Sequence, residues 1–311
     1  MKKTRIWRHI AYMWFLLLFW VSFESGCGKS SDSNEVWSVH IVGVDSLVVE
    51  SRNLLVDFSK SQAWTIRNIK YMGKEIVGEH GANGTVVSAE PKKELNTTDR
   101  WHGTGHGKED VSSFTVVIDN IPQEFHAGMT FSGNEIKLRK ESIMGSLGHT
   151  AEITFPKTGD YIIEKHSYLV LDDFKERFYF VYAFMHCNAN VLNQWLALLE
   201  GGKELEGKAG KQDNSFSLQQ DIKAIIFYGE EPGKGVVYEY PEVYKGAGTF
   251  KNSIWDREHD NKLYFRPDIT VNDFNPGDRF EFVMKVTPFP AQPNDWKEKG
   301  RSLTGFEFIL P

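Results

Sequence analysis

The sequence predicts an all-β protein, built as a large antiparallel β-sandwich. From Val36 onward, short apolar or alternating segments follow one another, and Gly, Asn, Asp or Pro bounds most of them. About a dozen or more such segments occur without long helical patterns between them, which favours an antiparallel sandwich over an α/β fold. The clearest segments are 36–43, 46–51, 54–59, 112–119, 134–142, 151–156, 161–171, 177–186, 223–229, 235–240, 262–269 and 279–286.

Residues 1–26 are expected to be a signal peptide and not part of the fold. Four basic residues fall within the first eight positions, and the apolar run 10–23 is too short for a comfortable membrane span. The small pair Ser25-Gly26 before Cys27 resembles a bacterial lipoprotein signal. This resemblance implies lipidation of Cys27 and export to the periplasm or the cell surface. Plain secretion and an uncleaved anchor are the alternatives.

The remaining chain is expected to be a tether at 27–35 and a single sandwich domain at 36–311. The tether is rich in serine, which suits a flexible spacer. The formal charge is −6, and loss of the basic signal makes the chain more acidic. An acidic surface argues against nucleic acid as a partner and leaves the lipid anchor as the only expected membrane contact. Cys187 alone would remain after processing, so no disulfide framework is expected.

The segment 190–207, NVLNQWLALLEGGKELEG, has two interpretations. Leu192, Trp195, Leu196 and Leu199 fit the apolar stripe of a helix. The pair Gly201-Gly202 equally suits the two-residue turn of a β-hairpin. We favour the hairpin.

The first polar cluster is the stretch 100–110, RWHGTGHGKED. A zinc site and a phosphate-binding loop are both disfavoured, because glycines separate the two histidines and no helix follows. A solvated connecting loop and a loop at the rim of a binding site remain open. In the second case, proton transfer is assigned to His102 or His106, stacking on a sugar to Trp101, and binding of a carboxylate or hydroxyl to Arg100 and Lys108.

The second polar cluster ends the segment FYFVYAFMH. On a strand, Tyr182, Phe184 and His186 would share one face. A tyrosine and a histidine on one face can form an acid–base pair, and the alternative is a core-facing triplet with a hydrogen-bonded histidine. Cys187 would face the other side as a small buried residue.

The third polar cluster is the stretch 254–268, IWDREHDNKLYFRPD. If it is a strand, Asp256, Glu258 and Asp260 share one face, and carboxylates held together can have raised pKa values that suit acid–base chemistry. A solvated loop is the alternative. Arg257, Tyr264 and Trp255 are the candidates here for substrate contact.

Two further stretches resemble a known fold. Residues 64–87 alternate, turn at Met72-Gly73 and alternate again, which is similar to the opening hairpin of galactose-mutarotase-like domains. Residues 275–289, NPGDRFEFVMKVTPF, resemble the closing turn and last long strand of that fold. The resemblance implies a β-supersandwich of a carbohydrate-active protein. It also implies His186 as the catalytic acid and Glu258 as the base of an aldose-epimerase-like site.

The resulting hypothesis is an exported protein that acts on a sugar or a uronic-acid polysaccharide by His–carboxylate chemistry, epimerase-like or lyase-like. Carbohydrate is the expected partner, and neither a cofactor nor a metal is expected. A carbohydrate-binding lipoprotein without catalysis is the alternative, with Trp101, Trp195 and Trp255 as stacking surfaces. A structural lipoprotein without a cleft is the third possibility.

Overall fold

A computed structural model describes residues 36–78, 83–88, 101–104, 109–172, 179–189, 191–209, 216–244, 252–257, 260–266 and 275–308. These residues all fall in one compact unit, Asn34–Pro311. They form two large antiparallel sheets, which confirms the predicted all-β class. Within the described ranges, no helix has the length and apolarity needed to cross a bilayer.

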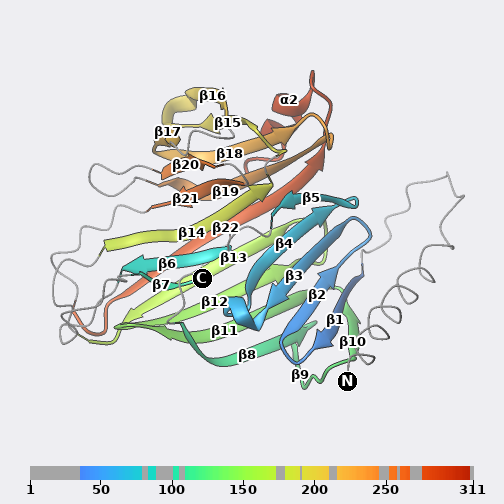
Figure 1. Ribbon diagram of the computed structural model, residues 1–311, viewed down its shortest axis with the longest axis vertical. Helices are drawn as coiled ribbons and strands as arrows, with labels where there is room; N and C mark the ends of the chain where they lie inside the picture. Colours follow the sequence, from blue (N-terminus) through green and yellow to red (C-terminus); the bar gives the residue numbers. More distant parts are fainter. Residues whose placement is uncertain are drawn as a thin grey trace, which may run out of the picture. The chain divides into compact units, whose positions relative to one another are not determined.

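The first sheet has twelve strands and begins with a meander of neighbouring segments, coloured blue in Figure 1. In spatial order its strands are β10 (Thr130–Gly133), β1 (Trp37–Gly43), β2 (Ser46–Glu50), β3 (Leu54–Ser59), β4 (Thr65–Tyr71), β5 (Lys74–Val77), β14 (Tyr179–Ala189), β21 (Asp260–Phe265), β20 (Asn252–Asp256) and β17 (Phe216–Gln220). The short strand β6 (Gly84–Ser88) also pairs with β14, and β7 (Trp101–Gly103) pairs with β6. A single residue pair, Asn188 with Val77, joins β14 to β5.

The second sheet has ten strands. Their order is β16 (Glu204–Lys208), β15 (Gln194–Leu198), β18 (Ile222–Gly229), β19 (Lys234–Tyr244), β22 (Arg279–Pro290), β13 (Ile162–Val170), β12 (Leu147–Phe155), β11 (Ile136–Met144), β8 (Asp110–Ile118) and β9 (Ile121–Gln123). Two 3₁₀ turns, η1 (Lys60–Gln62) and η2 (Glu200–Gly202), and one helix, α2 (Trp296–Ser302), complete the described elements.

The core lies between the two sheets, because one side chain in two along most strands points inward. In β13 the burial alternates from Ile162 to Val170 without interruption. The rings of Trp37 and Phe58, from the twelve-stranded sheet, lie 5.1 Å and 6.2 Å from that of Phe155 on the ten-stranded sheet. Trp37 also donates its Nε1 hydrogen to the carbonyl of Pro156 at 2.7 Å. These contacts between aromatic rings pack the twelve-stranded sheet against the ten-stranded sheet.

The segment 194–208 is a β-hairpin, as favoured from the sequence, and the helical interpretation is wrong. Strands β15 and β16 pair antiparallel and close at the pair Leu198–Glu204. Gly201 and Gly202 have φ values of 71° and 76°, a conformation that other residues adopt only with strain. Trp195 is only 5% exposed, and its ring packs over Gly207. The prediction of Trp195 as a sugar-stacking surface is therefore wrong.

The two turns quoted for the fold resemblance are present. Strands β4 and β5 close at Tyr71–Lys74, with positive φ at both Met72 and Gly73. Gly277, at φ 100°, precedes the long strand β22. The sequence analysis missed helix α2, whose Trp296 ring stacks on Tyr228 at 5.3 Å between ring centroids.

Candidate functional site: an aromatic surface and a buried polar network

Strands β20 and β21, near one edge of the twelve-stranded sheet, present two different faces. Ile254 of β20 pairs with Leu263 of β21, and both belong to the inter-sheet core. The next residues along these strands, Trp255 and Tyr264, point to the opposite face because side chains alternate along a strand. There they form a separate small cluster with Val86 of β6. This outer face is turned away from the ten-stranded sheet.

Three aromatic rings follow one another across this outer face, and we call them with Arg257 the aromatic surface. The ring of Trp255 lies 6.2 Å from Phe216 and 6.0 Å from Tyr264, stacked in both cases. The Arg257 guanidinium lies 5.0 Å from the Trp255 ring centroid, within the range of a cation–π interaction. Phe216 is 47% exposed and Trp255 is half-buried, whereas Tyr264 is only 5% exposed, so a ligand reaches the row at its Phe216–Trp255 end.

Two cations, Arg257 and Lys262, lie beside the aromatic surface together with the buried carboxylate of Asp260. Lys262 is paired with Trp255 across β20 and β21 and therefore lies on the same face. The Arg257 side chain is 35% exposed and lies 3.7 Å from the carboxylate of Asp260. The backbone N–H of Arg257 also donates to the carbonyl of Asp260 at 3.1 Å. Arg257 thus belongs to the turn between β20 and β21, so the interpretation of 256–260 as one strand is wrong.

His186 lies on the inner face of the same sheet. It is paired with Leu263 and is fully buried, and its Nε2 lies 3.4 Å from Oε1 of Glu164 on β13. Burial lowers the pKa of His186 and raises the pKa of Glu164. Because His186 and Tyr264 are on opposite faces, a ligand on the aromatic surface would not touch the His186 ring.

His186 ends a chain of buried polar groups that crosses the core, which we call the buried polar network. In the ten-stranded sheet, Glu109 Oε1 lies 2.7 Å from Nζ of Lys140 and 3.3 Å from Nδ1 of His149. Nε2 of His149 lies 2.9 Å from Nδ1 of His166. Further members are Ser142, Thr85, Tyr168, Glu164 and His186.

The charges within this network are fixed by burial and by pairing. Burial lowers the pKa values of His149 and His166 to about 3, so both rings are neutral at pH 7. Hydrogen bonding to His149 and the charge of Lys140 outweigh the opposing effect of burial on Glu109 and lower its pKa to about 2. Burial also lowers the pKa of Lys140, against the attraction of Glu109. Lys140 and Glu109 therefore form an ion pair whose side chains are 3% and 2% exposed.

The stretch 100–110 is only partly a loop. Trp101–Gly103 forms β7, and His102 is 8% exposed opposite Val87, a residue of the inter-sheet core. His102 thus points inward and not toward a solvent-filled rim. Arg100, His106 and Lys108 lie outside the described residues, as does the side chain of Trp101.

Several other predicted positions also lie outside the described part. These are Cys27 with the rest of 1–35, Glu258, and the side chains of Tyr182 and Cys187. The backbone of Tyr182 pairs with Val86, and the register shifts between Tyr182 and Met185. A β-bulge thus interrupts the alternation from which a shared face of Tyr182 and His186 was predicted.

The sequence analysis missed most of the buried polar network, although one signal was present. In the segment Ile162–Val170, Glu164, His166 and Tyr168 occupy the same alternating positions as the apolar residues. Polar residues that keep the phase of an apolar strand face indicate a buried hydrogen-bonded cluster. Glu109 was within the quoted stretch 100–110 but was not singled out.

Two classes of chemistry can be assigned from these groups. Within the described part of the chain, no three His, Cys, Asp or Glu residues are arranged to hold a metal ion. The aromatic surface combines ring faces with cations, which suits binding of a ligand that has both apolar faces and negative charge. The buried polar network holds proton donors and acceptors that a ligand on the aromatic surface does not reach.

The molecule is therefore a two-sheet antiparallel β-sandwich with an aromatic, cation-bearing surface on one outer face. No protein-family model matches the sequence, and no curated protein matches it. Among solved structures, it is similar to a galactose mutarotase-like protein from Lactobacillus casei, at 10% identity and a TM-score of 0.48, over 78% of this chain and 100% of that chain.

Two further solved structures are similar to this chain. A galactose 1-epimerase from Lactobacillus acidophilus is 11% identical, with a TM-score of 0.47, over 84% of this chain and 100% of that one. The heparan sulfate lyase HepC from Pedobacter heparinus is 10% identical, with a TM-score of 0.42, over 92% of this chain but 42% of that one. At such identities the likeness concerns the fold alone.

Proposed function

We propose that this protein is an exported carbohydrate-binding protein whose aromatic surface binds an acidic polysaccharide. The observation that carries the proposal is the stacked pair of exposed Phe216 and half-buried Trp255, with Arg257 over the Trp255 ring and buried Tyr264 supporting that ring from the other side. The C–H face of a sugar ring packs on an aromatic ring, and a guanidinium pairs with the carboxylate of a uronic acid. Lys262 lies on the same face but is only 8% exposed, so Arg257 is the cation that we assign to the carboxylate of the ligand.

Charge favours an acidic over a neutral ligand at this surface. The chain as a whole is acidic, with a formal charge of −6, so clustered cations are not a general property of its surface. Arg257 has a partner in the buried carboxylate of Asp260, and at 3.7 Å this contact is longer than a direct hydrogen bond and leaves the Arg257 side chain 35% exposed. A carboxylate of the ligand can therefore engage the guanidinium without disrupting a strong internal bond.

Binding without catalysis fits this geometry better than acid–base catalysis. His186 is buried on the opposite face of the sheet from Trp255 and Tyr264. Catalysis by His186 and Glu258 stays a prediction, because Glu258 lies outside the described residues.

The proposal is tested by binding of the full-length protein to polygalacturonate and alginate, with neutral dextran for comparison, by isothermal titration calorimetry. We expect binding to an acidic polymer that weakens by about tenfold, roughly 1.4 kcal/mol, in Trp255→Ala and in Arg257→Ala. Arg139→Ala is the matched control, because Arg139 is an exposed arginine on the other sheet, paired with Glu152. Absence of binding to both acidic polymers, or equal binding by Trp255→Ala, would contradict the proposal.

Export is tested separately. We propose that Cys27 is lipidated, on the basis of the Ser-Gly-Cys sequence that follows the apolar run. Metabolic labelling with a palmitate analogue should mark the wild-type protein and leave Cys27→Ser unlabelled. Equal labelling of the two would exclude Cys27 as the acylated residue.

A further inference from the structure

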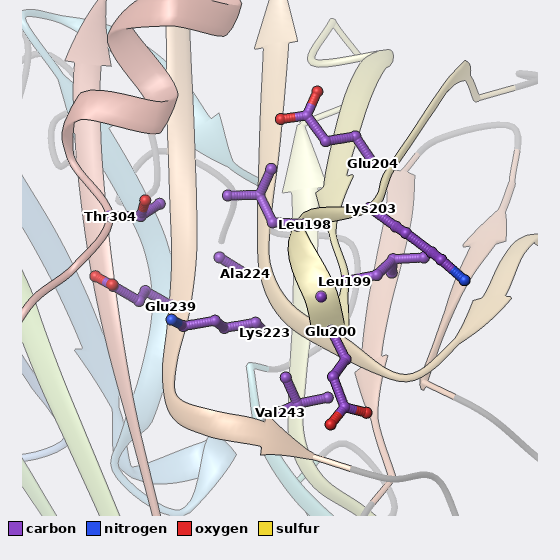
Figure 2. Close-up of a pocket in the computed structure, with 12 residues that line it drawn as sticks. Leu198, Leu199, Glu200, Lys203, Glu204, Lys223, Ala224, Glu239, Val243 and Thr304 are labelled. Atoms are coloured by element: carbon purple, nitrogen blue, oxygen red, sulfur yellow. The ribbon is translucent and has the colours of Figure 1, made fainter.

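A pocket of about 360 Å³ opens on the ten-stranded sheet, at the tip of the β15–β16 hairpin (Figure 2). Its apolar lining comes from Leu198, Ala224 and Val243, and its polar lining includes Lys223, Glu239 and Thr304. Small-molecule sites combine a mostly apolar lining with a few placed polar groups, and this volume is at the lower end of their range. The pocket is thus large enough for one small ligand.

Glu239 of β19 is the central polar group of this pocket. The residue is 2% exposed, and its Oε1 accepts hydrogen bonds from the backbone N–H groups of Gly305 and Phe306. These two bonds fix the carboxylate in place. Its second oxygen, Oε2, is buried and has no hydrogen-bond partner in the described structure. A buried carboxylate oxygen without a donor is unfavourable, so Oε2 is an acceptor prepared for a donor from outside the chain.

Lys223 of β18 supplies the complementary donor. Its side chain is exposed and extends toward the Glu239 carboxylate in Figure 2. A ligand between the two would meet a hydrogen-bond acceptor on one side and an ammonium donor on the other. Hydroxyl groups satisfy both, because each can donate to a carboxylate and accept from an ammonium group.

The charges around the pocket nearly cancel. Glu200 and Lys203 lie at the tip of the hairpin, and Glu204 is neutralised by Arg301 at 2.7 Å. Glu239 and Lys223 contribute one charge of each sign to the lining, and Lys285 of β22 lies opposite Glu239 as a further cation. A lining with nearly balanced charge disfavours strongly anionic or cationic ligands.

We propose that this pocket binds a neutral sugar residue, as a second site separate from the aromatic surface. The proposal does not depend on the proposed function, because the two sites lie on different sheets and differ in the charge they select. Sugar hydroxyls bond to Glu239 and Lys223, and the apolar face of the ring packs on Leu198 and Ala224.

The test is saturation-transfer difference NMR of the full-length protein with the methyl glycosides of glucose, galactose, mannose and N-acetylglucosamine. At least one should show transfer to its ring protons, and its Kd should rise by about tenfold in Lys223→Ala and in Glu239→Gln. Glu239→Gln keeps the oxygen that binds Gly305 and Phe306 but replaces the free acceptor by a donor. Lys208→Ala, an exposed lysine outside the pocket, should bind as wild type does.

Trp255→Ala separates the two sites, since it should leave binding of the neutral sugar unchanged. No transfer to any of the four sugars would overturn the inference, as would an unchanged Kd in both Lys223→Ala and Glu239→Gln. Glycine or betaine should show no transfer. Binding of either zwitterion in place of the sugars would also overturn the assignment.

Discussion

Nε2 of His149 lies 2.9 Å from Nδ1 of His166, and both imidazole rings are buried. Because burial keeps both rings neutral, only one of these two nitrogens carries the hydrogen. Nδ1 of His149 lies 3.3 Å from the ionised Glu109, which accepts and cannot donate. His149 therefore carries its hydrogen on Nδ1, and His166 donates from its own Nδ1 to Nε2 of His149.

This arrangement predicts the tautomers of two histidines. Nitrogen-15 correlation spectra at pH 7 should show the Nδ1–H form for both His149 and His166. His149→Gln and His166→Gln assign the signals. An Nε2–H form of His149, or protonation of both its nitrogens, would mean that Glu109 does not set the direction of the hydrogen bonds.

The same histidines predict loss of stability in acid. Their pKa values are about 3 in the folded protein and about 6.5 in an unfolded chain, so the unfolded state binds more protons between these values. Stability is then fully present above about pH 6.5 and falls as the pH is lowered toward 3. Each histidine should remove about 2 kcal/mol from the unfolding free energy between pH 7 and pH 5.

Other groups modify this pH dependence. Glu109, with its pKa lowered to about 2, acts in the same direction below about pH 4.5. Glu164, whose pKa is raised by burial, acts in the opposite direction. Urea denaturation at pH 5, 6 and 7 measures the sum. His149→Gln should flatten the curve. A wild-type stability that rises from pH 7 to pH 5 would contradict the assignment.

Lys140 and Glu109 form an ion pair that should be costly to break on one side only. Lys140→Met leaves the Glu109 carboxylate buried without its cation, and we expect the unfolding free energy to fall by about 3–5 kcal/mol. Lys140→Met combined with Glu109→Gln should recover part of this loss. Arg139→Met, at the neighbouring exposed ion pair with Glu152, should cost less than about 1 kcal/mol. Equal effects of Lys140→Met and Arg139→Met would show that the Lys140 pair is solvated.

Gly103 should tolerate no side chain. Its φ is 103°, and a Cβ would lie 2.3 Å from the carbonyl oxygen of Thr85. Gly103→Ala should lower the unfolding free energy by about 1–3 kcal/mol, measured by urea denaturation. Gly148→Ala is the control, because its nearest neighbours would lie at 3.6 Å and 3.7 Å. A Gly103→Ala protein as stable as wild type would mean that β7 is not held against β6 in this way.

The alternating segments predicted the fold class well, because a strand that buries one face alternates apolar and polar residues along its sequence. The Gly-Gly pair at 201–202 and the Met72-Gly73 turn predicted two hairpins. Tight turns need residues with positive φ, and glycine, which adopts it most easily, is visible in the local sequence. Trp255 and Tyr264 could also be named in advance, as aromatic residues beside arginine and lysine, but the sequence did not show that Tyr264 is buried beneath Trp255.

The polar core could not be predicted in the same way. Whether His186 faces solvent or another sheet depends on Glu164 and Tyr238, which are distant in sequence and belong to the opposing layer. The charged stretch at 256–260 was left open between a strand and a solvated loop, because nothing local reveals that the N–H of Arg257 bonds to the carbonyl of Asp260. Helix α2 was missed because Trp296 gains its burial from Tyr228, not from a repeating apolar pattern.

The single residue pair between β5 and β14 has a consequence for the order of assembly. Strands β1 to β5 are joined by short turns and pair with their sequence neighbours, whereas β14 pairs with β21 and with β5 through residues more than sixty positions apart. Contacts between neighbours form faster than distant ones, so a chain leaving the ribosome can complete β1 to β5 long before β14 has been synthesised. The junction at Val77 and Asn188 then closes after β1 to β5, and because it has a single residue pair we expect its amide hydrogens to exchange early with solvent.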